Sequence, residues 1–286
     1  MLISQILLLG LFKGSVYSLI AIGFTLIFGV ARILNLGHGT FYMLGAYFTY
    51  SLAVNFHLSP LNSLIASCLL VGSIGMGFYY FIIRKLQSKE SYVLVITLAF
   101  ALLGQYAIFA VYGSKARHVS SFLLGGINLF GVDFAYQRLF ILLVFLIATA
   151  TILLFLKATS FGKAIRALAQ NRNAAILMGI DPPKMFTATF GIASFLAALA
   201  GGIISPIWSV DPTMWFFPLI KAFSIVVLGG LGSVFGSIIG AFILGYAETI
   251  TSLVISDYLS NMVSLVILIT VLLFKPTGIM GGTLKS

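Results

Sequence analysis

The sequence predicts an all-α, polytopic transmembrane helical protein with interrupted or re-entrant helices. Apolar residues make up 60% of the 286 residues and charged residues only 8%, whereas an ordinary soluble domain has roughly 25% charged residues. Several apolar runs reach the roughly 20 residues that a helix needs to cross about 30 Å of hydrocarbon. These runs are continuous rather than alternating, which disfavours a membrane β-barrel.

The apolar runs predict helices at about 5–30, 41–56, 61–83, 92–112, 137–156 and 185–207. Two shorter runs follow at 219–228 and 233–248, and a last helix is expected at 259–274. Lys and Arg accumulate in cytoplasmic loops. Arg84, Lys85 and the five basic residues of 157–184 are therefore expected on the inner side, and the loop 113–136 on the outer side. This bias explains the net charge of +10, so we expect no nucleic acid as a partner.

This orientation requires the region 219–248 to return to the outer side. We expect a broken or re-entrant helix that turns at 229–232, GGLG. One continuous span would instead place the C-terminus outside. Non-helical backbone is tolerated at membrane depth only where protein or a water-filled cavity satisfies its polar groups.

A second break is predicted at 35–39, NLGHG. Paired interrupted helices are an indication of a transport site. The candidates for the substrate path are Asn35, Gly37, His38, Gly39, Lys221, Gly229, Gly230 and Gly232.

Three of these candidates have structural alternatives. Lys221 is a cation in an apolar region, which is costly; it meets a substrate carboxylate, pairs with another residue, or extends to the outer interface. His38 either bonds local backbone and holds the break or lines the pathway. Gly232, Gly236 and Gly240 are spaced by four, which predicts one closely packed helix face or a pathway lining.

The segment 157–184, KATSFGKAIRALAQNRNAAILMGIDPPK, is polar and basic between two apolar runs. Its composition predicts one amphipathic helix over 161–178, ended by Gly179 and the following prolines. Such a helix rests on lipid headgroups or inserts into a partner's groove; a solvated basic loop is the alternative.

The stretch GKAIRALAQNRNAAILMGID resembles the cytoplasmic coupling segment of ABC importer permeases, in particular the branched-chain amino acid permease family. Residues 173–179 stand where the importer motif has Glu-Ala-Ala-x-x-x-Gly, with Asn in place of Glu and without the downstream Ile-x-Leu-Pro. The segments 17–39 and 221–240 resemble the family's N-terminal and C-terminal signatures. By this resemblance, the residues expected to couple to an ATPase are Lys163, Arg166, Asn173, Ala174, Ala175 and Gly179.

The resemblance implies one transmembrane permease domain over 1–286 with the coupling segment 157–184. It implies an ATP-driven importer subunit for branched-chain or similar amino acids, delivered by an external binding protein. The expected location is the bacterial inner membrane, where the chain spans the lipid bilayer several times. The expected partners are ABC ATPase subunits, a second homologous permease (the same or a different chain) and a soluble substrate-binding protein.

The sequence indicates no chemistry of its own. It has no metal-ligand spacing, no Gly-rich Lys-Ser/Thr phosphate loop and no nucleophile with a base. We therefore expect no enzyme activity, cofactor or metal, with ATP hydrolysis on separate subunits. One alternative keeps the architecture but carries urea or a short amide. Another is an ion-coupled secondary transporter or channel, for which Glu248 is the only candidate intramembrane carboxylate.

Overall fold

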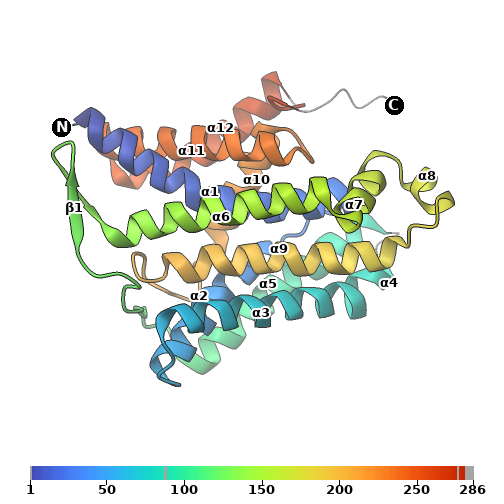
Figure 1. Ribbon diagram of the computed structural model, residues 1–286, viewed down its shortest axis with the longest axis horizontal. Coiled ribbons are helices and arrows are strands. Elements are labelled where there is room, and N and C mark those ends of the chain that lie inside the picture. The colour runs from blue at the N-terminus through green and yellow to red at the C-terminus, as the bar shows by residue number, and fades with distance from the viewer. Residues whose placement is uncertain (1, 87–88, 276, 281–286) are drawn as a thin grey trace.

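The computed structural model describes residues 2–86, 89–275 and 277–280. It is a bundle of long helices lying side by side, with a small β-hairpin at one end and two short helices at the other (Figure 1). Among the described residues, seven helical segments are long and apolar enough to cross a membrane, which confirms the predicted fold class. They are α1 (Leu2–Ala31), the segment Pro60–Leu86, α5 (Glu90–Tyr112), α6 (Tyr136–Ala158), α9 (Pro182–Ile204), α11 (Val234–Val254) and α12 (Asp257–Phe274).

The segment Pro60–Leu86 is one continuous helical span made of three elements. They are α3 (Pro60–Phe78), the π-helix η1 (Tyr79–Ile83) and α4 (Arg84–Leu86). Ser59 begins it by accepting a hydrogen bond from the Asn62 N–H with its side chain, as an N-cap residue does.

Two shorter helices, α2 (His38–Val54) and α10 (Phe216–Gly229), follow the breaks in the chain. The 14 residues of α10 extend only about 21 Å at 1.5 Å per residue, which is less than the hydrocarbon thickness. Helices α10 and α11 run antiparallel, because Gly229 packs against Gly236 and Ile225 against Gly240. The predicted turn at 229–232 is therefore confirmed.

The turn between α10 and α11 needs glycine at two positions. Gly230 has φ 105° and Gly232 has φ 87°, a backbone region that glycine enters without steric cost. The predicted common helix face of Gly232, Gly236 and Gly240 is wrong for Gly232. That residue lies in the turn, before α11 begins at Val234.

Helices α1 and α9 form the centre of the bundle. In the apolar part of α1, 83% of the residues are buried, and in that of α9 72% are, against 11% in α12. The helices α2 and α3 pack on α9, while α10 and α11 pack on α1. Helices α5, α6 and α12 therefore present broad apolar faces to lipid or to other subunits.

The two ends of the bundle differ in charge. The strands β1 (Gly126–Leu129) and β2 (Val132–Ala135) form the hairpin at one end, with Leu129 paired with Val132. The opposite end holds α7 (Ser160–Gln170) and α8 (Arg172–Leu177). This second end carries most of the described basic side chains, among them Arg32, Arg84, Lys85, Lys157, Lys163, Arg166, Arg172 and Lys184. The positive-inside bias therefore assigns the α7–α8 end to the cytoplasm.

Close helix contact depends on particular glycines, which gives a stability prediction. A Cβ at Gly201 in α9 would overlap the Tyr42 carbonyl oxygen of α2, whereas a Cβ at Gly77 in α3 would meet only Phe81, at 3.9 Å. We expect Gly201→Ala to destabilise the fold by about 1–3 kcal/mol through overpacking. The matched control Gly77→Ala gains helix propensity, up to about 1 kcal/mol. Thermal unfolding of both variants in detergent measures the difference, and equal midpoints would contradict the proposed contact.

Candidate functional site

A buried cluster of three polar side chains lies inside the bundle. The Tyr17 hydroxyl donates to Glu248 Oε2 over 2.6 Å. Lys221 Nζ donates to the same Oε2 over 2.9 Å and to the Tyr17 oxygen over 2.8 Å. The residues come from α1, α11 and α10 in turn, and none is more than 7% exposed. The cluster therefore ties the short helix α10 to two full-length helices.

This cluster resolves the alternatives for Lys221. The structure places its ammonium group in an ion pair with Glu248, so it does not extend to the outer interface. Glu248 Oε1 is buried and has no hydrogen-bond partner among the described residues. Tyr17 was not among the predicted site residues. The available signal is that a tyrosine hydroxyl in an apolar run needs a polar partner.

The first break lies at residues 32–37, so the predicted bounds 35–39 are wrong for His38 and Gly39, which already belong to α2. Side chains accept hydrogen bonds from backbone N–H groups of this break. Asn35 Oδ1 accepts the Gly37 N–H over 3.0 Å, and Thr97 Oγ1 from α5 accepts the Leu36 N–H over 3.2 Å. Arg32 begins the break with φ 51°, an uncommon region for a residue with a side chain. These bonds allow the chain to leave helical geometry inside the protein.

Helix α2 begins next to the start of α10. His38 Nε2 lies 3.1 Å from the Ile20 carbonyl oxygen of α1, a bond to another helix rather than to local backbone. A Cβ at Gly39 would overlap the Trp215 carbonyl oxygen just before α10. Three buried polar atoms at this point have no partner among the described residues: Asn35 Nδ2, His38 Nδ1 and Thr40 Oγ1.

The two predicted breaks do not meet. Residues 35–39 lie by the start of α10, while 229–232 lie at its end, where Gly232 packs against Gly29 near the end of α1. The last carbonyls of α10 accept hydrogen bonds from 279–280: Ile279 N–H bonds Leu228 over 2.8 Å and Met280 N–H bonds Gly229 over 3.0 Å. Residues 35–39 are therefore close to Trp215, just before α10, and to Leu219 in its first turn.

The basic segment forms two helices, so the single helix predicted over 161–178 is wrong. Asn171 separates α7 from α8 with extended backbone, φ −151° and ψ 104°, and its side chain accepts the Ala174 N–H over 3.0 Å. Asparagine at an N-cap stabilises such a new helix start. Gly179, with φ 81°, follows the end of α8 at Leu177.

The two faces of α7 and α8 have different surroundings. Ile165, Leu168 and Ala175 are buried against the bundle, and Arg172 lies over the Phe186 ring of α9 at 5.5 Å. The predicted coupling residues that are exposed are Lys163, Arg166, Asn173, Ala174 and Gly179.

Two apolar side chains at the tip of the segment were missed by sequence analysis. Leu177 is 88% exposed and Met178 83% exposed. Both follow Ala175 within the coupling motif, so their position in that motif is the signal that was available. The two side chains are therefore a small apolar patch at the polar end of the bundle.

A cleft of about 730 Å³ joins the coupling segment to the first break. One wall is the break, with Arg32, Ile33 and Leu34, and the other is the junction of α7 and α8, from Gln170 to Asn173. The start of α5, with Glu90, closes a third side. A displacement of α7–α8 would therefore change this cleft directly.

The buried cluster gives a stability prediction. Removing one partner of a buried ion pair costs about 3–5 kcal/mol, whereas replacing both partners is often nearly neutral. We expect Lys221→Met to lower the unfolding midpoint strongly, and the double variant Lys221→Met/Glu248→Gln to recover most of the loss. Lys115→Met, at an exposed lysine in the outer loop, is the control and leaves stability unchanged. A double variant no more stable than the single one would contradict the pairing.

Comparison with known proteins places this geometry in a family. The family described as "Branched-chain amino acid transport system / permease component" matches residues 6–272. The chain is 31% identical to the high-affinity branched-chain amino acid transport system permease protein BraD of Pseudomonas aeruginosa, over 97% of this chain and 95% of that protein. It is 30% identical to the permease protein LivH of Escherichia coli K12, over 95% and 93%.

A solved structure supports the fold alone. The chain is similar to a chain of PsaBC from Streptococcus pneumoniae in complex with Fab, with a TM-score of 0.54 and 12% identity, over 95% of this chain and 92% of that one. The family match and the structural similarity both cover nearly the whole chain. The protein belongs to the family of branched-chain amino acid transport system permease components, as a multi-pass membrane protein.

Proposed function

We propose that the chain is the membrane-spanning permease subunit of an ATP-driven importer of branched-chain or similar amino acids in the bacterial inner membrane. The family and the relatives named for high-affinity branched-chain amino acid transport support the cargo class. The observation that carries the mechanism is the cleft whose walls are the coupling segment and the first break.

Energy comes from separate ATPase subunits, because the sequence has no phosphate-binding loop. The exposed pair Leu177 and Met178 at the tip of α8 is the apolar contact for an ATPase groove. The exposed Lys163 and Arg166 of the neighbouring helix α7 add positive charge at the same end of the bundle. An apolar centre with a polar rim is the usual arrangement of a protein–protein interface.

Nucleotide-driven movement of the ATPases reaches the path through α7–α8. Arg172 stacks on Phe186 and Ala175 is buried, so these helices move together with the inner end of α9. Their displacement opens or closes the cleft beside residues 32–34. Rigid-body movement of packed helices about breaks is a common mode of switching, and the cargo crosses unchanged.

The path passes the start of α2. The N-terminus of α2 has no side-chain cap at Gly37, and a helix N-terminus favours a carboxylate. The unpartnered atoms of Asn35, His38 and Thr40 add polar groups there, while the surrounding side chains are largely apolar and suit leucine, isoleucine or valine. Lys221 is held by Glu248, so its role is to fix α10 rather than to bind cargo.

The glycines at the end of α10 serve close packing rather than binding. Gly229 and Gly230 are buried in the turn toward α11, and Gly232 touches Gly29 of α1. Small residues at a contact of this kind let two backbones approach closely.

The two remaining partners use other surfaces. A second permease completes the pore along the outward apolar faces of α5, α6 or α12. An external binding protein docks at the end of the bundle that carries the β-hairpin.

The coupling assignment predicts a specific loss. Leu177→Asp/Met178→Asp removes the apolar contact without touching the buried side of α8. We expect at least a tenfold fall in ATP-driven uptake in proteoliposomes holding the full complex, with normal membrane insertion. The conservative control Leu177→Ile/Met178→Leu keeps uptake near that of the unaltered protein. Unchanged uptake in the aspartate variant would refute this coupling surface.

The energy source separates an importer subunit from an ion-coupled transporter. Glu248 is the intramembrane carboxylate that such a transporter would use, but it is already paired with Lys221. We expect vesicles that contain the permease alone to show no concentrative uptake under any ion gradient, and uptake to appear when the ATPases, binding protein and ATP are added. Gradient-driven uptake by the permease alone would establish the rival function.

Cargo is tested on the binding protein that works with the permease. We expect it to bind leucine, isoleucine or valine more tightly than urea or short amides in calorimetric titration. A preference for urea or an amide would mean that the permease has the same architecture but transports a different substrate.

A further inference from the structure

An apolar groove of about 630 Å³ lies on the outside of the bundle, away from the cleft and the breaks. Helices α3 and α6 form its sides and α9 its floor (Figure 1). Gly72 of α3 lies close to the Gly191 carbonyl of α9, so α3 packs directly on the floor of the groove. Leu69 and Ile147 on its two sides are 60% and 58% exposed, so the groove opens outward toward the bilayer.

The groove offers almost no polar atoms to an occupant. Among its lining residues only Ser73 and Thr151 carry a hydroxyl group, and Ser73 donates its own to the Leu69 carbonyl. On α9 the groove runs from Leu199 to Ala188, about 17 Å at 1.5 Å per residue. The groove begins about 9 Å from the inner end of α9 at Pro182 and stops about 8 Å short of its outer end at Ile204, so an acyl chain that enters from the inner side would run along the middle of the span.

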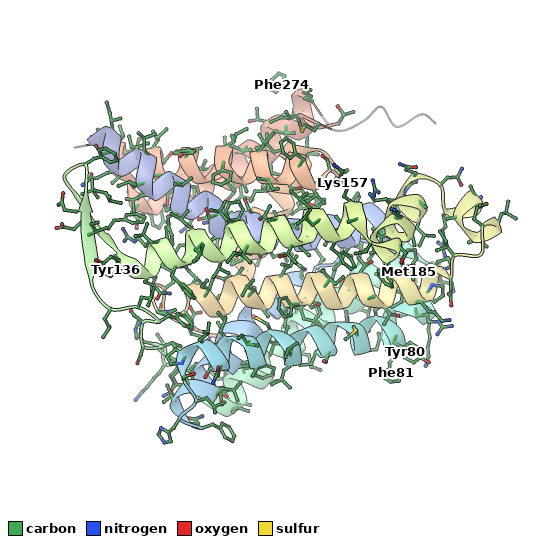
Figure 2. The ribbon with its side chains drawn as sticks, in the orientation of Figure 1. Tyr80, Phe81, Tyr136, Lys157, Met185 and Phe274 are labelled. Atoms are coloured by element: carbon green, nitrogen blue, oxygen red, sulfur yellow. The ribbon has the colours of Figure 1, made fainter. Side chains whose placement is uncertain are left out.

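The inner end of the groove leads to positive charge. Lys184 lies one helical turn before Ala188 on the same face of α9. Its side chain is 80% exposed and lies 3.5 Å from Asp181 Oδ2, in an ion pair that is open to solvent. On the α3 side of the groove, Tyr80 lies about one helical turn beyond Met76 and Arg84 about two turns beyond it. The Arg84 guanidinium lies over the Tyr80 ring at 5.4 Å. Figure 2 shows Tyr80 and Met185 at this same end of the bundle.

We propose that this groove is a binding site for an anionic phospholipid of the inner leaflet. One acyl chain fills the groove between α3 and α6, and the phosphate lies by Lys184 and Arg84. Basic residues next to a groove between membrane helices favour anionic headgroups. The bound chain fills the space that α3 and α6 leave open over α9, and it supports the packing of α9 beside the coupling segment.

Lipid retention tests the proposal without measuring transport. The permease is reconstituted in vesicles of phosphatidylcholine with phosphatidylglycerol as the minor lipid, extracted in mild detergent, and analysed by native mass spectrometry. We expect phosphatidylglycerol to remain bound. Ala188→Trp should abolish its retention by filling the groove, while Leu146→Trp, at an exposed position of α6 outside the groove, should not.

The charge requirement is tested separately. We expect Lys184→Gln/Arg84→Gln to lower retention of phosphatidylglycerol at least about fivefold and to leave any retained phosphatidylcholine unchanged. Lys275→Gln, beyond the end of α12 and away from the groove, should have no effect. Equal retention in all variants would overturn the proposal, as would equal retention of both lipids.

A cross-linking measurement identifies the occupant directly. Cys68 is buried, so a photoactivatable group on Thr151→Cys would report on the groove selectively. A lipid adduct is expected. An adduct to a second permease chain would overturn the proposal and make this face a subunit interface.

Discussion

Inside a bilayer, any backbone group that leaves helical pairing must find another partner within the protein. This constraint governs the two breaks. At the first, the side chains of Asn35 and Thr97 accept the N–H groups of 36–37. At the second, the chain near 279–280 returns to bond the last carbonyls of α10. The breaks are therefore ordered parts of the structure that can persist in hydrocarbon.

Burial of the breaks requires helices to approach closely, and glycine makes this approach possible. Gly39 meets the backbone before α10, Gly201 meets α2, and Gly229 meets Gly236. The cluster of Tyr17, Lys221 and Glu248 then fixes α10 between α1 and α11. Charges of opposite sign in one buried site cost far less than either charge alone, so the cluster holds the short helix α10 in place.

The same arrangement connects the cytoplasmic surface to the interior. Helices α7 and α8 are bound to the bundle by buried Ile165, Leu168 and Ala175, while Leu177 and Met178 project outward. The cleft behind them ends at the first break. A partner that moves the tip of α8 therefore acts on the place where the membrane helices are interrupted, without a long chain of intermediate contacts.

Composition and run length determined that the chain is a polytopic helical membrane protein, because only continuous apolar helices satisfy the backbone across hydrocarbon. Glycine-rich motifs also located the turn at 229–232 and a break after the first apolar run, although that break lies at 32–37 rather than at 35–39. Tertiary structure decided what these features contact. Lys221 finds Glu248 from a different helix, and 35–39 faces the start of α10 rather than its end. The division of the coupling segment at Asn171 and the exposure of Leu177 also required the fold. Pairing between distant residues depends on how the helices pack, and that packing cannot be read from local sequence patterns.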